Sequence, residues 1–206
     1  MDKGFAKKVI FSLFFLVSSC ASAQSMHLEI NENYFGGEVE STVEVFIFDG
    51  IKLSPIDRES KFFRKKIPVT EGNYFAIFFI KEGFIPEVKV LLAGKKDIKI
   101  GKIRLKKMIY EKKGFLVGVV YKPIHGGKVS LRKGIVKLIG RVDINVVCDK
   151  RGQYITRARD DGVYSIQLVA GKYKLFISDN KDVLDVIIKK GKTTIQNLQK
   201  GMMLID

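Results

Sequence analysis

The residues that could support catalysis or metal binding are few and far apart along this chain. His27 and His125 are the only two histidines, and neither has a cysteine or a second histidine at the spacing of a zinc site. Cys148 continues an alternating apolar stretch, which predicts a buried structural thiol rather than an exposed nucleophile. We therefore expect no catalytic residue, no metal site and no cofactor.

Two short motifs match catalytic or nucleotide-binding signatures only in part. Gly191–Thr194 reads GKTT, like the end of a phosphate-binding loop. Val186 stands where that loop needs its first glycine, and a strand rather than a helix is expected to follow. The adjacent acids Asp160 and Asp161 fit a turn better than an acid–base pair across a cleft. These observations favour a protein that is not an enzyme.

Basic residues provide the strongest candidate for a binding site. Residues 128–141 and 150–159 contain nine Lys and Arg but no Asp or Glu. If these segments are neighbours, they form a positive face that attracts phosphates, sulfates or carboxylates. Alternatively, the charges only keep a β-protein soluble and protect its edges. The candidate anion-binding residues are Lys128, Arg132, Lys133, Lys137, Arg141, Lys150, Arg151, Arg157 and Arg159.

Positive charge is concentrated in the second half of the chain. The formal net charge is +15, and residues 107–206 hold 20 Lys and Arg against nine Asp and Glu. Such asymmetry suggests a polyanionic partner. No aromatic ladder interleaves the basic residues, so the pattern does not indicate a nucleic-acid partner.

The N-terminal residues have the pattern of a bacterial secretion signal. Lys3, Lys7 and Lys8 precede an apolar run over Val9–Ser19. This run is shorter than the roughly 17–25 apolar residues that cross a bilayer. We therefore expect export and exclude the segment from the fold.

Two processing sites compete after this run. Ala21-Ser22-Ala23 fits ordinary cleavage, which would remove residues 1–23. Leu16–Cys20 resembles the bacterial lipobox, in which case residues 1–19 are the signal and Cys20 is lipidated. The two readings predict a periplasmic or extracellular protein and an outer-membrane lipoprotein held by its lipid anchor, respectively.

Period-two alternation of apolar residues marks strands along the chain. Val43–Phe48, Val142–Cys148 and Tyr173–Ile177 each place apolar side chains on every second residue. Turn signals such as Asp161-Gly162 separate these segments. No segment beyond the signal predicts a helix of ten or more residues. The patterns predict an all-β fold of sandwiches.

Residues 160–177 are expected to form a hairpin. Asp161-Gly162 begins a strand with Tyr164 on its inner face, and Gly171 reverses the chain because glycine tolerates positive φ. The return strand carries Tyr173 inward. Both rings are expected to be buried, with their hydroxyls near polar backbone, which is a structural role.

An internal repeat divides the chain. Residues 72–105 and 171–198 share one order, which is Gly-x-Tyr, apolar strand, turn, apolar strand, Gly-Lys and a closing strand. We therefore expect two tandem domains, at 24–106 and 115–206, joined by a basic linker at 107–114.

The second copy carries a family resemblance. RDDGVYSIQLVAGKYKLFI (159–177) followed by VIIKKGKTTIQNL (186–198) resembles the carboxypeptidase regulatory-like domain, a transthyretin-like (prealbumin-like) β-sandwich. Asp160 stands where that family often has threonine, and the first copy matches mainly through Gly72–Tyr74 and Lys81–Phe84. The resemblance implies two tandem transthyretin-like sandwiches after a signal peptide, and a non-catalytic module of envelope or secreted proteins.

Two functions remain open from the sequence. The first is a non-catalytic interaction or scaffold module of the cell envelope, lipid-anchored and accessory to a larger assembly, with an envelope protein as partner. The alternative is a module that binds an acidic glycan or lipid, such as lipopolysaccharide or a wall polymer, through the basic face of the second domain.

Overall fold

The computed structural model describes most of the chain beyond the N-terminal segment. It covers residues 24–31, 43–56, 62–69, 72–94, 103, 105–109, 112–126, 136–178, 182–201 and 203–205. The expected signal and Cys20 lie outside the described residues. Every regular element in these ranges is a strand, which confirms the all-β prediction. None of the described segments is an apolar helix of bilayer-spanning length.

Six of the described strands belong to the first half of the chain. They are β1 (Gln24–Asn31), β2 (Glu44–Phe48), β3 (Leu53–Pro55), β4 (Phe62–Val69), β5 (Tyr74–Ile80) and β6 (Glu87–Leu92). β1 pairs with β4, and the other four form an antiparallel sheet in the order β3-β2-β5-β6. This sheet is the central element of the first half.

Ten described strands belong to the second half. They are β7 (Lys113–Gly126), β8 (Val136–Leu138), β9 (Asp143–Cys148), β10 (Gly152–Arg157), β11 (Val163–Val169), β12 (Gly171–Ile177), β13 (Leu184–Ile188), β14 (Thr193–Ile195), β15 (Leu198–Gln199) and β16 (Met203–Ile205). They form one sheet in the order β10-β9-β12-β13 and another in the order β11-β7-β14. β8 also pairs with β7, and β14, β15 and β16 run parallel to it.

The two sheets of the second half enclose an apolar core. Ile144 and Val146 of β9 and Leu175 of β12 are fully buried against Leu116 and Val120 of β7. These residues alternate with outward-facing neighbours, as the period-two pattern predicts for a sandwich. The inward faces expected for Val142–Cys148 and Tyr173–Ile177 are therefore confirmed.

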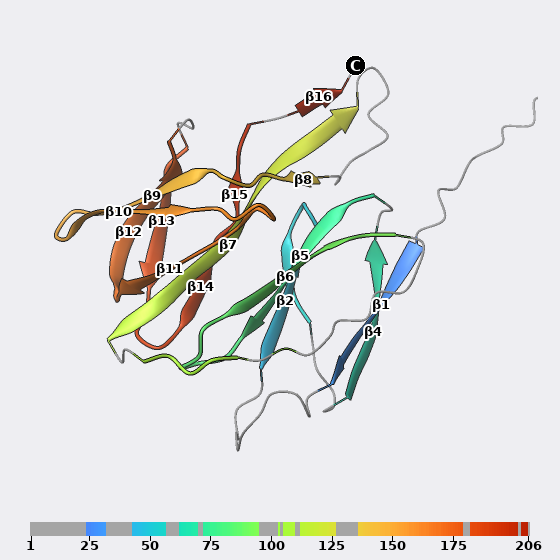
Figure 1. The fold of residues 1–206 in the computed structure, drawn as a ribbon, viewed down its shortest axis with the longest axis horizontal. Coiled ribbons are helices and arrows are strands. Elements are labelled where there is room, and N and C mark those ends of the chain that lie inside the picture. Colours follow the sequence, from blue (N-terminus) through green and yellow to red (C-terminus); the bar gives the residue numbers. More distant parts are fainter. Residues whose placement is uncertain are drawn as a thin grey trace, which may run out of the picture.

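A second apolar core joins the two halves. The opposite face of β7, with Val117 and Val119, packs with Phe48, Ala76 and Phe78 from the sheet of the first half. In Figure 1, β7 runs diagonally between β9, β10, β12 and β13 on one side and β2, β5 and β6 on the other. Because both of its faces are covered, β5 has a nearly continuous apolar sequence.

Hydrogen bonds also link the two halves. The Asn73 side chain, which is 6% exposed, accepts from the Val136 amide at 2.8 Å and donates to the Asp49 carbonyl at 2.8 Å. The Gly83 amide donates to the Gly191 carbonyl at 2.8 Å. The contact between the halves therefore combines apolar packing with directional bonds.

The strand order of the first half recurs in the second. The orders β3-β2-β5-β6 and β10-β9-β12-β13 are equivalent, and β1 pairs with β4 as β7 pairs with β11. The repeat seen in the sequence thus has a counterpart in topology. β7 begins at Lys113, inside the expected linker. Through the shared core, the two halves pack directly against each other. The division into two separate domains stays a prediction.

The expected hairpin at residues 160–177 is wrong. β11 pairs with β7 in one sheet, whereas β12 pairs with β9 and β13 in the other. The chain therefore crosses between the two sheets at Ala170–Gly171, and Gly171 does not have positive φ. The tyrosines do have the expected structural role. Tyr164 donates to the Gln196 carbonyl and Tyr173 donates to the Val169 carbonyl at 2.7 Å.

The two Gly-x-Tyr motifs are out of phase with respect to the core. Tyr173 points into the core of the second half and is 2% exposed. Tyr74 is only half-buried, because Phe75, Ile77 and Phe79 are the β5 residues that face the core of the first half. The motifs mark equivalent strand starts, but their tyrosines lie on opposite faces.

Candidate functional site

The candidate cations lie at separate places in the structure. Lys128, Arg132 and Lys133 lie outside the described residues, and Lys137 is exposed on β8. The other candidates are at the two ends of the β9–β10 ribbon, with Arg141, Arg157 and Arg159 at one end and Lys150 and Arg151 in the connecting turn.

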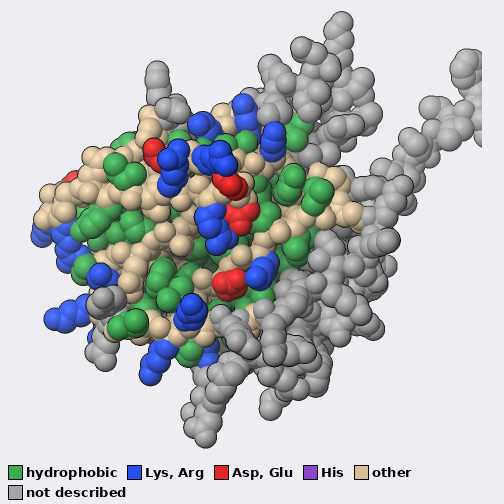
Figure 2. All heavy atoms as spheres, viewed as in Figure 1, with side chains coloured by type: hydrophobic (Ala, Val, Ile, Leu, Met, Phe, Trp, Pro, Cys, Tyr) green, Lys and Arg blue, Asp and Glu red, His purple; other side chains and the backbone are tan. Residues whose placement is uncertain are grey.

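The three arginines at one end each pair with an aspartate. Asp143 begins β9, and Asp160 and Asp161 lie in the turn before β11, so the acids come from segments outside the basic stretches. On the face of the molecule that Figure 2 draws, Asp and Glu side chains (red) lie directly beside Lys and Arg (blue). The pairs are Arg141–Asp160 at 2.7 Å, Arg157–Asp143 at 3.4 Å and Arg159–Asp161 at 2.8 Å.

A tight crossing of two loops positions the Arg141 pair. A Cβ atom on Gly140 would lie 2.6 Å from the Arg159 carbonyl oxygen, so only glycine fits there. Arg141 follows with φ of 59°, a conformation that is uncommon for residues other than glycine. The hydrogen bond and charge of Arg141 lower the pKa of Asp160, and Asp160 raises the pKa of Arg141. This end of the sheet is therefore locally charge-balanced.

The two remaining basic residues lie at the opposite end of the ribbon. Lys150 is exposed in the turn, and the Arg151 guanidinium donates to the Ala170 carbonyl at 3.2 Å. The length of β9 separates them from the Arg–Asp pairs by roughly 15–20 Å. The described basic candidates thus do not form one cluster. Anion binding by these residues stays a prediction.

The residues considered for catalysis, Cys148 and the two histidines, all lie on strands. Cys148 is half-buried at the end of β9, packs against the core and is a free thiol. His27 lies on β1 and His125 on β7. The part of the chain that the structure describes contains no group of His, Cys, Asp and Glu that could hold a metal ion. A strand, β14, follows Gly191, as expected.

Lys81 is a buried cation to which sequence analysis assigned no role. It is 6% exposed, and its Nζ lies 4.6 Å from the centre of the Phe84 ring, within the range of a cation–π contact. Desolvation lowers its pKa. A lysine that directly ends a wholly apolar strand was the available signal. Lys81 is followed by a turn that contains Gly83, whose amide donates a hydrogen bond to the Gly191 carbonyl. Lys81 therefore lies at the junction of the two halves.

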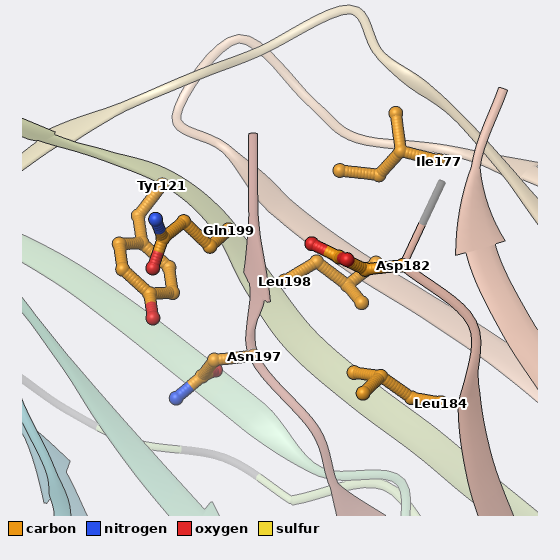
Figure 3. A pocket seen from close by; sticks show the side chains of 7 residues that line it. All are labelled: Tyr121, Ile177, Asp182, Leu184, Asn197, Leu198 and Gln199. Carbon is orange, nitrogen blue, oxygen red and sulfur yellow. The ribbon is translucent and has the colours of Figure 1, made fainter. Parts of the chain in front are cut away.

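A pocket of about 210 Å³ opens around β15. Tyr121, Asn197 and Gln199 lie on one side of this strand in Figure 3, and Asp182, Leu184 and Ile177 lie on the other. The Asn197 side chain also accepts from the Val119 amide at 3.1 Å. The polar groups do not converge on one point, which a small-molecule site requires.

Comparisons with known proteins give distant structural similarity only. No protein-family model matches the chain, and no curated protein does either. The Bacillus anthracis TIE protein is similar with a TM-score of 0.34 and 12% identity, covering 86% of this chain and 34% of that one. The minor pilin GBS52 of Streptococcus agalactiae gives 0.34 and 10%, covering 86% and 95%. The shaft pilin SpaA of Lactobacillus rhamnosus GG gives 0.24 and 6%, covering 86% and 97%.

Proposed function

We propose that this protein is a non-catalytic interaction or scaffold module of the cell envelope, carried on a lipid anchor as an accessory to a larger assembly. The apolar core shared by the two halves is the observation that carries the proposal. Phe78 on β5 and Val119 on β7 are completely buried in it. A joint of this kind holds two sheet stacks in fixed relation, as a rigid spacer requires.

The N-terminal pattern supports the envelope part of the proposal. A basic start, a short apolar run and the lipobox-like Leu16–Cys20 together fit export followed by acylation. A diacylated or triacylated cysteine supplies two or more chains, which is enough for stable membrane anchoring. The folded part would then stand on the membrane surface.

Crosslinking in intact cells tests the proposal. The captured species and the N-terminus of the protein are identified by mass spectrometry, with Cys20→Ser as the matched control. We expect acyl chains on Cys20, release of Cys20→Ser from the membrane, and one dominant protein partner. Capture of glycan or lipid without a protein partner would contradict the scaffold role and favour the acidic-ligand alternative.

The alternative, binding of an acidic glycan or lipid, has its own signature. Such binding weakens steeply with salt, because it depends on exposed charges. Replacing Arg132, Lys133, Arg157 and Arg159 together by glutamine would then abolish it. The pairing of Arg157 and Arg159 with aspartates makes this the second candidate.

A further inference from the structure

The sheet β10-β9-β12-β13 has one face in the core and one face toward solvent. Ile144, Val146 and Leu175 point inward, so by alternation Val147 and Phe176 point outward. We call this solvent side the outer face. Its apolar members are Val147, Ile155, Phe176, Val183 and Ile187.

The outer face is equivalent to a face that is buried in the first half. We align the inward pair Ile47 and Ile77 with the inward pair Val146 and Leu175, because each pair joins the two central strands of its sheet and faces the core. One residue further along the strands, Phe48 and Phe78 correspond to Val147 and Phe176. In the first half these positions are covered by the β7 sheet. The equivalent sheet face is therefore buried in the first half and exposed to solvent in the second.

Polar replacements distinguish the open face from the covered one. Three apolar positions of the first half are polar in the second, while the central phenylalanine is kept. The outer-face residues and their counterparts are Asn145 and Phe46, Lys174 and Ala76, and Ser178 and Ile80. A mixture of this kind is typical of interfaces that form and separate, whereas obligate interfaces are more apolar.

The buried polar side chain of the outer face, Asn145, makes its hydrogen bonds within the chain. Asn145 is 6% exposed; its amide donates to Ser178 Oγ at 2.8 Å and accepts from Gln153 Nε2 at 2.5 Å. Covering the face therefore leaves the Asn145 amide paired. The face is therefore suited to being either exposed or covered.

Three well-exposed apolar side chains lie on the outer face. Ile155 is 64% exposed, Val183 is 53% exposed and Ile187 is 55% exposed. Ile155, Asn145 and Phe176 pair in sequence across three strands, and continuation of the register places Val183 beside Phe176. A row that is apolar at Ile155, Phe176 and Val183, with Asn145 between the first two, thus crosses the sheet.

Charge on the outer face is nearly balanced in a strongly basic protein. Asp143 and Asp185 offset Arg157 and Lys174, and Lys172 adds one further positive charge. The chain as a whole carries +15, so two copies repel through most other surfaces. A polyanion has little to attract it here, whereas a second copy meets exposed apolar side chains flanked by both signs of charge.

We propose that the outer face is a reversible contact between two copies of this chain, related by a two-fold axis. Four strands spaced by about 4.8 Å and roughly 20 Å long present roughly 400 Å² per copy. The total of roughly 800 Å² is below the roughly 1,200 Å² at which stable interfaces begin, so the dimer is weak and transient and depends on concentration. Membrane anchoring would raise the local concentration. The inference concerns this face alone and does not depend on the proposed envelope partner.

Sedimentation velocity of the full chain carrying Cys20→Ser tests the contact over micromolar to millimolar concentration. The test variant is Ile155→Lys with Ile187→Lys, and the matched control is Ile109→Lys at a site that is 84% exposed and away from this sheet. We expect the parent and the control to increase in mean mass with concentration, and the test variant to associate at least tenfold more weakly. Circular dichroism melting checks that all three are folded.

Two outcomes would overturn the inference. One is a parent that stays monomeric throughout the concentration range. The other is association that is equal in the test variant and the parent. Neither outcome affects the envelope-scaffold proposal, which is decided by the partner captured in cells. Conversely, a dimer without any envelope partner would support this contact alone.

Discussion

Truncation of Phe78 to alanine tests whether the two halves unfold together. The ring is completely buried in the shared core, where residues of both β5 and β7 meet. Phe-to-Ala changes at buried sites cost about 3–5 kcal/mol, from lost transfer free energy and the cavity left behind. Total stabilities are about 5–15 kcal/mol, so roughly a fifth or more of the folding free energy is lost.

The expected thermal effect follows from the size of the protein. At about 2–4 °C per kcal/mol for a chain of this length, Phe78→Ala should lower Tm by roughly 6–20 °C. Ile51→Ala is the matched control in the same half, because Ile51 is 70% exposed and its truncation should change stability by less than about 0.5 kcal/mol.

Hydrogen exchange read by mass spectrometry distinguishes coupled from independent unfolding. If the shared core makes one cooperative unit, Phe78→Ala reduces protection in β9 and β12 as well as in β5. Loss of protection in β5 while β9 and β12 exchange as in the parent would show that the two halves unfold independently. Two separate transitions in urea, with only one shifted, would show the same.

Two other changes test particular contacts. Gly118→Ala would place a Cβ 1.8 Å from the Gln196 carbonyl oxygen, so β7 and the segment after β14 must separate. We expect the free energy of unfolding, measured in urea, to fall by more than about 2 kcal/mol. A variant as stable as the parent would contradict this close approach. Arg141 lowers the pKa of Asp160, so the pair adds stability above the unfolded pKa of about 3.9 and loses it as pH falls through the lower native pKa. Asp160→Asn should therefore melt slightly below the parent at pH 7 and converge with it near pH 2, and an equal difference at both pH values would contradict the assignment.

Much of the candidate site depends on partners that are remote in sequence. The basic stretch ending at Arg141 contains no acid, and the segment alone predicts a positive face. Asp160 reaches Arg141 only because two loops cross at Gly140, and Asp143 reaches Arg157 only through the β9–β10 pairing. Local composition could identify the cations and the adjacent Arg159–Asp161 pair, but not the pairing of Arg141 and Arg157.

The sequence by itself determined the strand content and the buried faces of the second half. Alternation at Ile144, Val146 and Leu175 is sufficient, because successive side chains of a strand point to opposite faces. It also indicated the repeat, since turns and apolar strands recur in the same order. Both properties are local and can be read residue by residue.

The tertiary structure alone decided how these strands are arranged. A turn at Ala170–Gly171 can return within one sheet or cross to another, and only long-range pairing of β11 and β12 selects the crossing. The burial of Phe78 and Val119 in the shared core likewise requires two sheets from different halves to meet. Because such pairings depend on residues far apart in the chain, no local pattern specifies them.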